Sequence, residues 1–258
     1  MASAARRSAR AAAYGPRPRR RRRSGRRLHS ACPRPGTVDL DGPVIFDLDG
    51  VIVDSEIWWD EVRQAFASAH GRSWDQTDQA AVMGANSRAW ARTMRERLAL
   101  DVSADDIEEA IVAGVVARYA GEGAPRIDGA VEAVRRIAAS RPVALASSAH
   151  RAVIDAALAA TGLTDTFSVI VSSDDVEHGK PAPDVYLAAA AQLGVDPAEC
   201  LVVEDSYNGI RAAHAAGMTT VLVPNASVPP APGTHEAADI VLAHLADLDP
   251  AAIRLRPA

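Results

Sequence analysis

The sequence predicts an α/β protein, in which a parallel sheet is covered by helices on both faces and a helical segment is inserted after the first strand. Five short apolar runs have the length and composition of buried strands. Helical patterns alternate with the last four runs, an order that is typical of parallel sheets. Between residues 56 and 121 only helical patterns occur. We therefore expect a three-layer α/β core with an all-helical insertion.

The first predicted strand is the run "PVIF" at 43–46, which is apolar and ends directly in an acidic residue. This form indicates a buried strand whose polar end reaches an edge of the sheet. Four later runs repeat it, at 142–147, 167–172, 200–205 and 219–224.

The predicted helices carry apolar residues at helical spacing. Val131, Val134 and Ile137, for example, lie three positions apart within residues 129–140. All four tryptophans fall inside the insertion, where we interpret them as the bulky core of a small bundle; one Trp lining a substrate entrance is the alternative. The other core helices are predicted at 150–161, 184–193 and 207–217, and those of the insertion at 56–70, 77–83, 87–99 and 104–120.

The net charge of −5 is unevenly distributed over the 258 residues. Residues 1–38 hold 12 arginines and no acidic residue, so residues 39–258 carry 16 basic and 33 acidic residues, a balance of −17. Such an acidic body is not expected to bind nucleic acid. We interpret the Arg-rich tail as functionless disorder, with a nucleic-acid-binding arm and a targeting segment as alternatives.

The length of the apolar runs and the number of cysteines limit the class of protein further. No apolar run approaches the roughly 20 residues of a membrane span, so no membrane partner is expected. Cys32 and Cys200 are the only cysteines and lie far apart in sequence, so neither a disulfide framework nor a cysteine metal site is predicted. A cytoplasmic location is therefore expected.

Polar residues follow four of the predicted strands. Because the carboxyl ends of parallel strands share one edge of the sheet, these side chains are expected to converge on a single pocket. They are Asp47 and Asp49 after the first strand, Ser147 and Ser148 after the second, Lys180 in the loop after the third, and Glu204 and Asp205 at the end of the fourth.

Such a pocket has the components of a phosphoryl-transfer site. Carboxylates held close together repel each other unless a cation lies among them, and an all-oxygen ligand set suits Mg²⁺. Ser147 precedes a predicted helix, so its hydroxyl and the nearby N–H groups can hold an anion. Asp47, at the strand end, can attack phosphorus, while Asp49 can protonate the leaving oxygen and later activate water.

Lys180 is the only lysine in the chain, in the stretch "EHGKPAPD". The other 27 basic residues are arginine. A slim ammonium with three rotatable donors can bridge two oxygens in a crowded site, where a planar guanidinium would displace the metal or the phosphate. We therefore place Lys180 between a carboxylate and the transferred phosphoryl group.

From about residue 43 to 224 the chain resembles the haloacid dehalogenase-like hydrolases, in particular the subfamily with a helical cap that includes beta-phosphoglucomutase and sugar-phosphate phosphatases. The resemblance rests on "FDLDGVIVDSE", "ALASSA", "GKPAPDVY" and "LVVEDSYNGIRAAHAAGM", in this order. It implies a Rossmann-like core at 39–54 and 128–258 and a cap at 55–127.

The resemblance also implies roles for single residues. Asp47 would be the nucleophile and Asp49 the acid and base. Ser147 and Lys180 would hold the phosphoryl group. The Mg²⁺ ligands would be Asp47, the Asp49 carbonyl and Asp205, with Glu204 contributing. Ser148, Glu56 and Arg88 are the predicted substrate-binding residues; "GANSR" at 84–88 is similar to a substrate-contacting loop of the mutase, with one extra residue.

The expected function is hydrolysis of a small phosphate ester, a sugar or polyol phosphate, by an Mg²⁺-dependent phosphatase with an aspartyl-phosphate intermediate. A phosphosugar mutase is the alternative. The beta-phosphoglucomutase pattern has a histidine twelve residues after the nucleophile, where this chain has Trp59, and this departure favours the phosphatase. A non-catalytic scaffold and a nucleic-acid binder acting through the basic tail are further alternatives. The sequence leaves the ester and the oligomeric state open.

Overall fold

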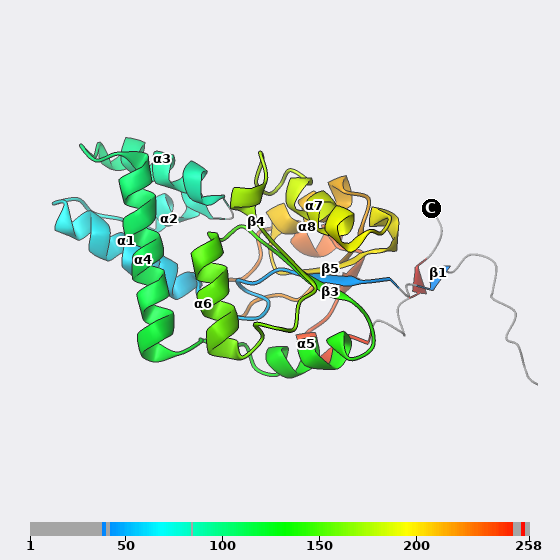
Figure 1. Ribbon diagram of the computed structural model, residues 1–258. Coiled ribbons are helices and arrows are strands. Elements are labelled where there is room, and N and C mark those ends of the chain that lie inside the picture. The colour runs from blue at the N-terminus through cyan, green and yellow to red at the C-terminus, as the bar shows by residue number, and fades with distance from the viewer. Residues whose placement is uncertain (1–37, 40–41, 84, 250–253, 256–258) are drawn as a thin grey trace, which may run out of the picture. The chain divides into compact units, whose positions relative to one another are not determined.

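The computed structural model describes residues 38–39, 42–83, 85–249 and 254–255. Its centre is a parallel sheet of six strands in the order β4-β3-β2-β5-β6-β7 (Figure 1). Five of these strands are β2 (Val44–Phe46), β3 (Val143–Ser147), β4 (Val169–Ser172), β5 (Leu201–Glu204) and β6 (Thr219–Leu222). The order confirms the predicted α/β class, and it places β2 next to both β3 and β5.

Helices cover both faces of this sheet because alternate strand residues point to opposite sides. Phe46 belongs to one apolar cluster and Ile45 to another. The Phe46 cluster includes α5 (Ala130–Ala138) and α6 (Arg151–Thr161), and the Ile45 cluster includes α7 (Asp184–Leu193) and α8 (Tyr207–Ala215). The three layers that the sequence predicts are therefore present.

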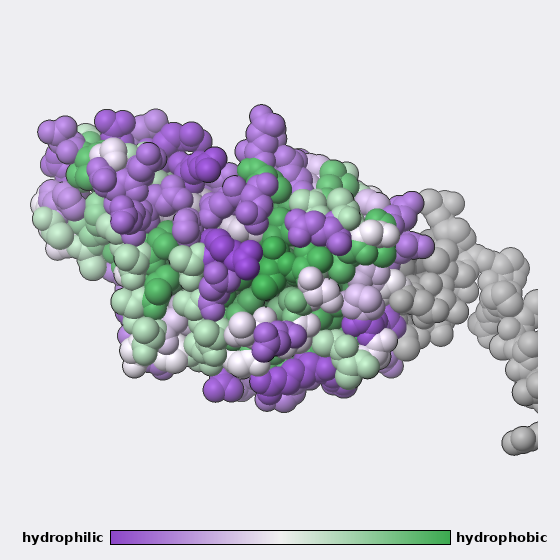
Figure 2. Space-filling view, viewed as in Figure 1, coloured by the Kyte–Doolittle hydropathy of each residue, from purple (hydrophilic) through white to green (hydrophobic). Residues whose placement is uncertain are grey.

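Four helices form the insertion between β2 and α5. They are α1 (Glu56–Ala69), α2 (Gln76–Val82), α3 (Ser87–Leu98) and α4 (Ala104–Glu122). In the view of Figure 2 the surface over α3 is mostly hydrophilic, as expected of a helix with one buried face. Each of these helices lies within two residues of its predicted bounds, because their apolar spacing and capping residues are clear in the sequence.

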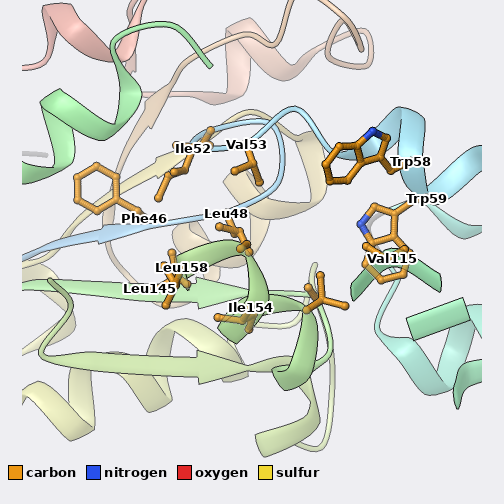
Figure 3. Packing of buried hydrophobic residues seen from close by; sticks show 14 of the residues in the cluster. Phe46, Leu48, Ile52, Val53, Trp58, Trp59, Val115, Leu145, Ile154 and Leu158 are labelled. Atoms are coloured by element: carbon orange, nitrogen blue, oxygen red, sulfur yellow. The ribbon is translucent and has the colours of Figure 1, made fainter. Parts of the chain in front are cut away.

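The tryptophans of the insertion are buried, as predicted. Trp58 packs edge-on against Tyr119 with ring centroids 5.0 Å apart, and Trp59 packs edge-on against Trp90 at 6.1 Å. Figure 3 shows Trp58 and Trp59 at one end of the apolar cluster that also contains Phe46 and Leu48. The apolar core of the insertion is thus continuous with that of the sheet.

The chain leaves the sheet and returns to it through two paired segments. Val53 forms an antiparallel bridge with Arg126. The Asp54 N–H donates to the Pro125 carbonyl at 2.7 Å, and the Ile127 N–H donates to the Ile52 carbonyl at 3.2 Å. The entry and exit of the helical insertion are therefore held side by side.

Four short elements are absent from the sequence prediction. They are β1 (Val38–Asp39), which pairs antiparallel with β8 (Arg254–Leu255), the edge strand β7 (Ile240–Val241), and α9 (Thr234–Ala237). Elements of two to four residues are too short to show a period. Apart from Val38, the predicted Arg-rich tail lies outside the described residues, as does Cys32.

In the part of the chain that the structure describes, no helix is long and apolar enough to cross a membrane. Cys200 is buried as a free thiol.

Candidate active site

The polar residues that follow the strands converge at the carboxyl edge of the sheet, as predicted. The Lys180 ammonium donates to Asp47 Oδ1 at 2.8 Å, to Glu204 Oε1 at 2.7 Å and to the Ala146 carbonyl at 3.2 Å. The Lys180 side chain is 4% exposed and that of Glu204 is fully buried. Each of the three N–H bonds of the ammonium therefore has an acceptor, and the charge is shared between two strand ends.

Glu204 is held by five donors. Its Oε1 accepts from Lys180 and from the Tyr186 hydroxyl at 2.8 Å. Its Oε2 accepts from the backbone N–H groups of Asp205 and Ser206, each at 3.0 Å, and from the Ser206 hydroxyl at 2.9 Å. Burial by itself would raise the pKa of Glu204, but the Lys180 charge and these hydrogen bonds outweigh it and lower the pKa. Glu204 therefore remains ionised and fixes Lys180.

Gly209→Ala is expected to lower the free energy of unfolding by about 3 kcal/mol or more, because a Cβ at Gly209 would lie 1.7 Å from Glu204 Oε1. The carboxylate would have to leave its five donors. Thermal and urea unfolding measure the change. The control is Gly121→Ala, since Gly121 is also helical but has nothing within 4 Å of its Cβ position. For Gly121→Ala we expect the free energy of unfolding to rise by about 0.5–1 kcal/mol. Equal effects at the two glycines would contradict the prediction.

The Asp47, Glu204 and Asp205 carboxylates form a cluster whose ligand atoms all lie within 4.8 Å of one another. Burial raises the pKa of Asp47 to about 7, and the Glu204 and Asp49 charges add to this effect against the opposing Lys180 charge. Burial, with Glu204 and Asp47, holds the pKa of Asp205 well above its usual range. A cation among these oxygens would relieve the repulsion. The all-oxygen donor set fits Mg²⁺.

Gly50 lets Asp205 reach this cluster. It has a φ of +82°, and an added Cβ would lie 2.0 Å from Asp205 Oδ2. Both the left-handed backbone and the close approach require glycine. The glycine of the "DG" pair, Asp49-Gly50, is thus explained by the close approach of the Asp205 carboxylate.

Asp49 faces the helical insertion rather than Lys180. It accepts a hydrogen bond from the hydroxyl of Ser55, which is fully buried, and the side chain of Trp59 lies close to it. Burial raises the pKa of Asp49, and the Ser55 and Trp59 donors partly offset this effect. Asp47 and Asp49 therefore differ in environment, because Asp47 is paired with a cation and Asp49 with neutral donors. Two carboxyls in such different environments can take different roles in a reaction.

A cavity of about 390 Å³ lies between the strand ends and the helical insertion. Its lining from the insertion includes Glu56, Trp59 and Arg63 on α1 and Trp90 on α3. A second cavity of about 380 Å³ shares Glu56 with the first. The remaining lining of the first cavity is Asp47, Asp49, Ala80, Val82, Met83, Ala85, Ser148, Ala149, Lys180, Asp205, Ser206, Tyr207, Asn208 and Val228 to Ala231.

Most of the predicted site residues line this cavity. Glu204 lies behind it and contacts Lys180. Ser147 is buried, its hydroxyl accepts from the Ala149 N–H at 3.1 Å, and Ser148 rather than Ser147 contributes to the lining. Arg88 is exposed at the start of α3 and is not among the lining residues, and Gly84 of the same loop lies outside the described residues. Substrate contact by Arg88 stays a prediction.

Sequence reasoning missed Arg63, Tyr207 and the loop at 228–231. For Arg63 a signal was present, since it lies four residues after Trp59 and seven after Glu56, which places all three on one face of α1. The loop had no such signal, because its place in the cavity depends on a contact distant in sequence. Asp54 accepts from the Asn225 amide at 3.0 Å and from the Ser227 hydroxyl, and these bonds fix the loop beside α1.

Comparison with known proteins gives a consistent family. A family model described as haloacid dehalogenase-like hydrolase matches residues 44–217. The bifunctional riboflavin kinase/FMN phosphatase of Arabidopsis thaliana is 33% identical over 211 residues, covering 81% of this chain; the chain spans only 55% of that protein. The fructose-1-phosphate phosphatase of Escherichia coli (strain K12) is 33% identical over 180 residues, covering 69% of this chain and 94% of that protein.

A solved structure agrees in fold. The crystal structure of beta-phosphoglucomutase from Clostridium difficile has a TM-score of 0.69 at 22% identity, covering 80% of this chain and 92% of that chain. At this identity the likeness concerns the fold alone.

Proposed function

The chain belongs to the haloacid dehalogenase-like hydrolases, and from this premise we propose that it is an Mg²⁺-dependent phosphatase of small phosphate esters with an aspartyl-phosphate intermediate. The observation that carries the proposal is the arrangement of the two aspartates around Lys180 and the cavity. Asp47 is held by the lysine at a strand end, and Asp49 is two residues further on with neutral donors.

In the first step, an Asp47 carboxylate oxygen attacks phosphorus and the bond to the ester oxygen breaks. Lys180 donates to Asp47 Oδ1, which leaves Oδ2 as the attacking atom and orients it. Asp49 gives its proton to the departing oxygen, and its raised pKa suits a group that begins the step protonated.

In the second step, water hydrolyses the aspartyl-phosphate. Asp49, now ionised, takes a proton from the water as it attacks phosphorus, and Asp47 is released as a carboxylate. The N–H groups around Ser148 are the donors available to the phosphoryl oxygens, and the Lys180 ammonium, whose N–H groups are held by Asp47, Glu204 and the Ala146 carbonyl, supplies a nearby positive charge.

Asp47 and Asp205, together with the Asp49 carbonyl, would hold Mg²⁺, which when bound neutralises charge on the phosphoryl oxygens. Glu204 would act differently from the sequence expectation. Its two oxygens already accept five hydrogen bonds, which supports a role in orienting Lys180 and Asp205 rather than as a direct ligand.

The helical insertion, residues 55–127, is proposed to act as the cap that selects the substrate. It supplies Glu56, Trp59 and Arg63 to the cavity, and its paired entry and exit segments are suited to a hinge. A cavity of about 390 Å³ under such a cap admits a metabolite but not a folded protein. A sugar or polyol phosphate is the proposed substrate, as for the fructose-1-phosphate phosphatase relative.

The phosphatase is favoured over the mutase by Trp59. This residue is 5% exposed and lies close to Asp49, so the position holds a neutral indole donor that cannot act as a base. A mutase must return the phosphoryl group to a sugar, and no residue at this position assists that transfer.

The proposal is tested by measuring phosphate release from a panel of sugar and polyol phosphates, with Mg²⁺ and with Mg²⁺ removed by a chelator. We expect release that falls by at least about 100-fold without the metal and returns when Mg²⁺ is restored. Isomerisation of glucose phosphates without net release would establish the mutase instead. Folded, Mg²⁺-binding protein that releases no phosphate from any ester would contradict the proposed function.

A further inference from the structure

Arg63 is a buried cation that the proposed chemistry does not use. It is 5% exposed and lies in the lining of the 390 Å³ cavity. Its guanidinium carbon is 5.1 Å from the ring centroid of Trp59 and 5.1 Å from that of Trp90. One terminal nitrogen donates to Gln79 Oε1 at 3.1 Å, an oxygen that also accepts from Trp74 Nε1 at 3.1 Å. The guanidinium is thus fixed by two rings and one amide.

The hydrogen-bonding capacity of this guanidinium is not filled. Among the described residues, the Nε–H of Arg63 has no acceptor, and no carboxylate oxygen lies within the 4.0 Å of an ion pair. Glu56, Asp60 and Asp49 act on it only at longer range. Burial lowers the pKa of Arg63 to about 10, so the group is still charged at neutral pH. A buried charge is costly without a contact partner, and this one is held where a ligand can reach it.

The cavity contains a second cation with a different position. Arg63 and Lys180 are the two cationic residues among the lining residues of the described chain. Lys180 belongs to the strand ends and has acceptors for all three of its N–H groups, whereas Arg63 comes from α1 of the insertion. If the phosphoryl group lies at Asp47 and Lys180, the leaving group extends toward the insertion. Arg63 is then the cation available to the leaving group.

Resting on the proposed phosphatase activity, we propose that Arg63 binds a second anionic group, a carboxylate or a second phosphate, on the leaving group of the substrate. A planar guanidinium is suited to two-point contact with such oxygens. The surrounding Trp59 and Trp90 rings exclude water and strengthen the pairing. Among small phosphate esters, the chain accordingly prefers those whose leaving group carries an anionic group over sugar or polyol monophosphates whose leaving group is uncharged.

Glu56 is the neighbouring group that bears on this pairing, because it lines the same cavity from the same face of α1. Burial, together with the Asp49 charge, raises the pKa of Glu56 to about 7. The anion is therefore bound beside a carboxyl that carries a proton over part of the neutral range, and such a carboxyl donates to the anion instead of repelling it.

The experiment compares kcat/KM within matched pairs of esters. Glycerol 3-phosphate and 3-phosphoglycerate differ in a terminal carboxylate, and fructose 1-phosphate and fructose 1,6-bisphosphate differ in a second phosphate. We expect the member with a second anionic group to be preferred by about tenfold or more in at least one pair, and Arg63→Met to remove that preference. Arg63→Lys should retain part of it. Arg92→Met, on the exposed face of α3, is the matched control and should leave the ratio unchanged.

Binding without turnover separates this inference from the proposed function. Trp59 and Trp90 flank Arg63, so the intrinsic tryptophan fluorescence of the Asp47→Asn protein follows binding of 3-phosphoglycerate and of glycerol 3-phosphate. Hydrolysis of glycerol 3-phosphate with no preference within either pair would overturn the role of Arg63 and leave the phosphatase intact. An equal loss for both members in Arg63→Met would also overturn it, because the residue would then be structural. Fluorescence discrimination without hydrolysis of any ester would support Arg63 and contradict the phosphatase.

Discussion

Asp47→Asn protein is expected to lose at least about 10⁴-fold in kcat while remaining folded. The amide has nearly the shape of the carboxylate and still accepts from Lys180, but it cannot attack phosphorus. Phosphate release and thermal unfolding, measured on the same preparation, separate the loss of the nucleophile from a loss of structure. A variant that retains more than about 1% of kcat would show that another group attacks phosphorus.

The difference in stability between Asp47→Asn and wild-type protein follows from the pKa of Asp47. Burial raises the pKa of Asp47 to about 7, above the value of an exposed aspartate, so the folded state holds a proton that the unfolded state has released. The stability that this proton contributes is present at low pH and is lost as pH rises toward 7. Metal-free Asp47→Asn protein should therefore be at least as stable as wild type at pH 8. A lower melting temperature at pH 8 would contradict the assignment of burial as the main cause.

Asp49→Asn tests whether the reaction passes through an aspartyl-phosphate intermediate. It retains the nucleophile but lacks the base that activates water, so the aspartyl-phosphate should accumulate. With p-nitrophenyl phosphate, whose leaving group needs little protonation, intact-protein mass spectrometry should detect one added phosphoryl group. Its absence, with steady turnover of the variant, would argue for direct attack by water.

Lys180→Met is expected to cost about 3–5 kcal/mol of folding free energy at pH 8 and at least about 10³-fold in kcat. The ammonium is the partner of two buried carboxylates, and its removal leaves Glu204 ionised without its cation. Chemical unfolding measures the first effect and phosphate release the second.

The pH dependence of the Lys180→Met deficit follows from Glu204. In wild type the pKa of Glu204 is lowered, mainly because Lys180 outweighs the opposing effect of burial. Without Lys180, burial is left to raise it, so the folded variant favours protonated Glu204 and loses stability as pH rises through the new pKa. The deficit should therefore be smaller at pH 5 than at pH 8. A deficit independent of pH would mean that the buried charge is not its cause.

Lys180→Arg is the control that keeps the charge and changes its shape. It should recover part of the stability but not the activity, because a planar fork cannot direct three bonds to Asp47, Glu204 and the Ala146 carbonyl within the same space. Near wild-type kcat in this variant would show that the single lysine of the chain is needed only for its charge.

The sequence predicted the strand ends well because their information is local. An apolar run followed by Asp47 and Asp49, or ending in Glu204 and Asp205, marks both the strand and its polar edge. Since parallel strands share an edge, convergence of these residues follows from topology alone, and the structure confirms it at Lys180.

The insertion side of the site was less predictable. Burial of the tryptophans was expected, but the place of Arg63 between Trp59 and Trp90 depends on the packing of α1 against α3. Arg88 is predicted as a substrate contact because its loop is similar to one in the mutase; the structure leaves it exposed and outside the cavity lining, and the contact stays a prediction. A side chain's direction at a helix start is set by tertiary contacts, which neither periodicity nor motif spacing reports.

The bridge between Val53 and Arg126 also bears on how the chain folds. Strands β2 and β3 pair with each other although residues 47–142 separate them. Their pairing therefore closes a long loop, at a cost in conformational entropy. Once Val53 and Arg126 are joined, only residues 47–53 and 126–142 remain to be closed, roughly a quarter of that length. A loop of a quarter of the length costs about 1.2 kcal/mol less free energy to close, since each halving of the length saves about 0.6 kcal/mol. Once the insertion has folded and joined Val53 to Arg126, the pairing of β2 with β3 therefore has only a short loop left to close.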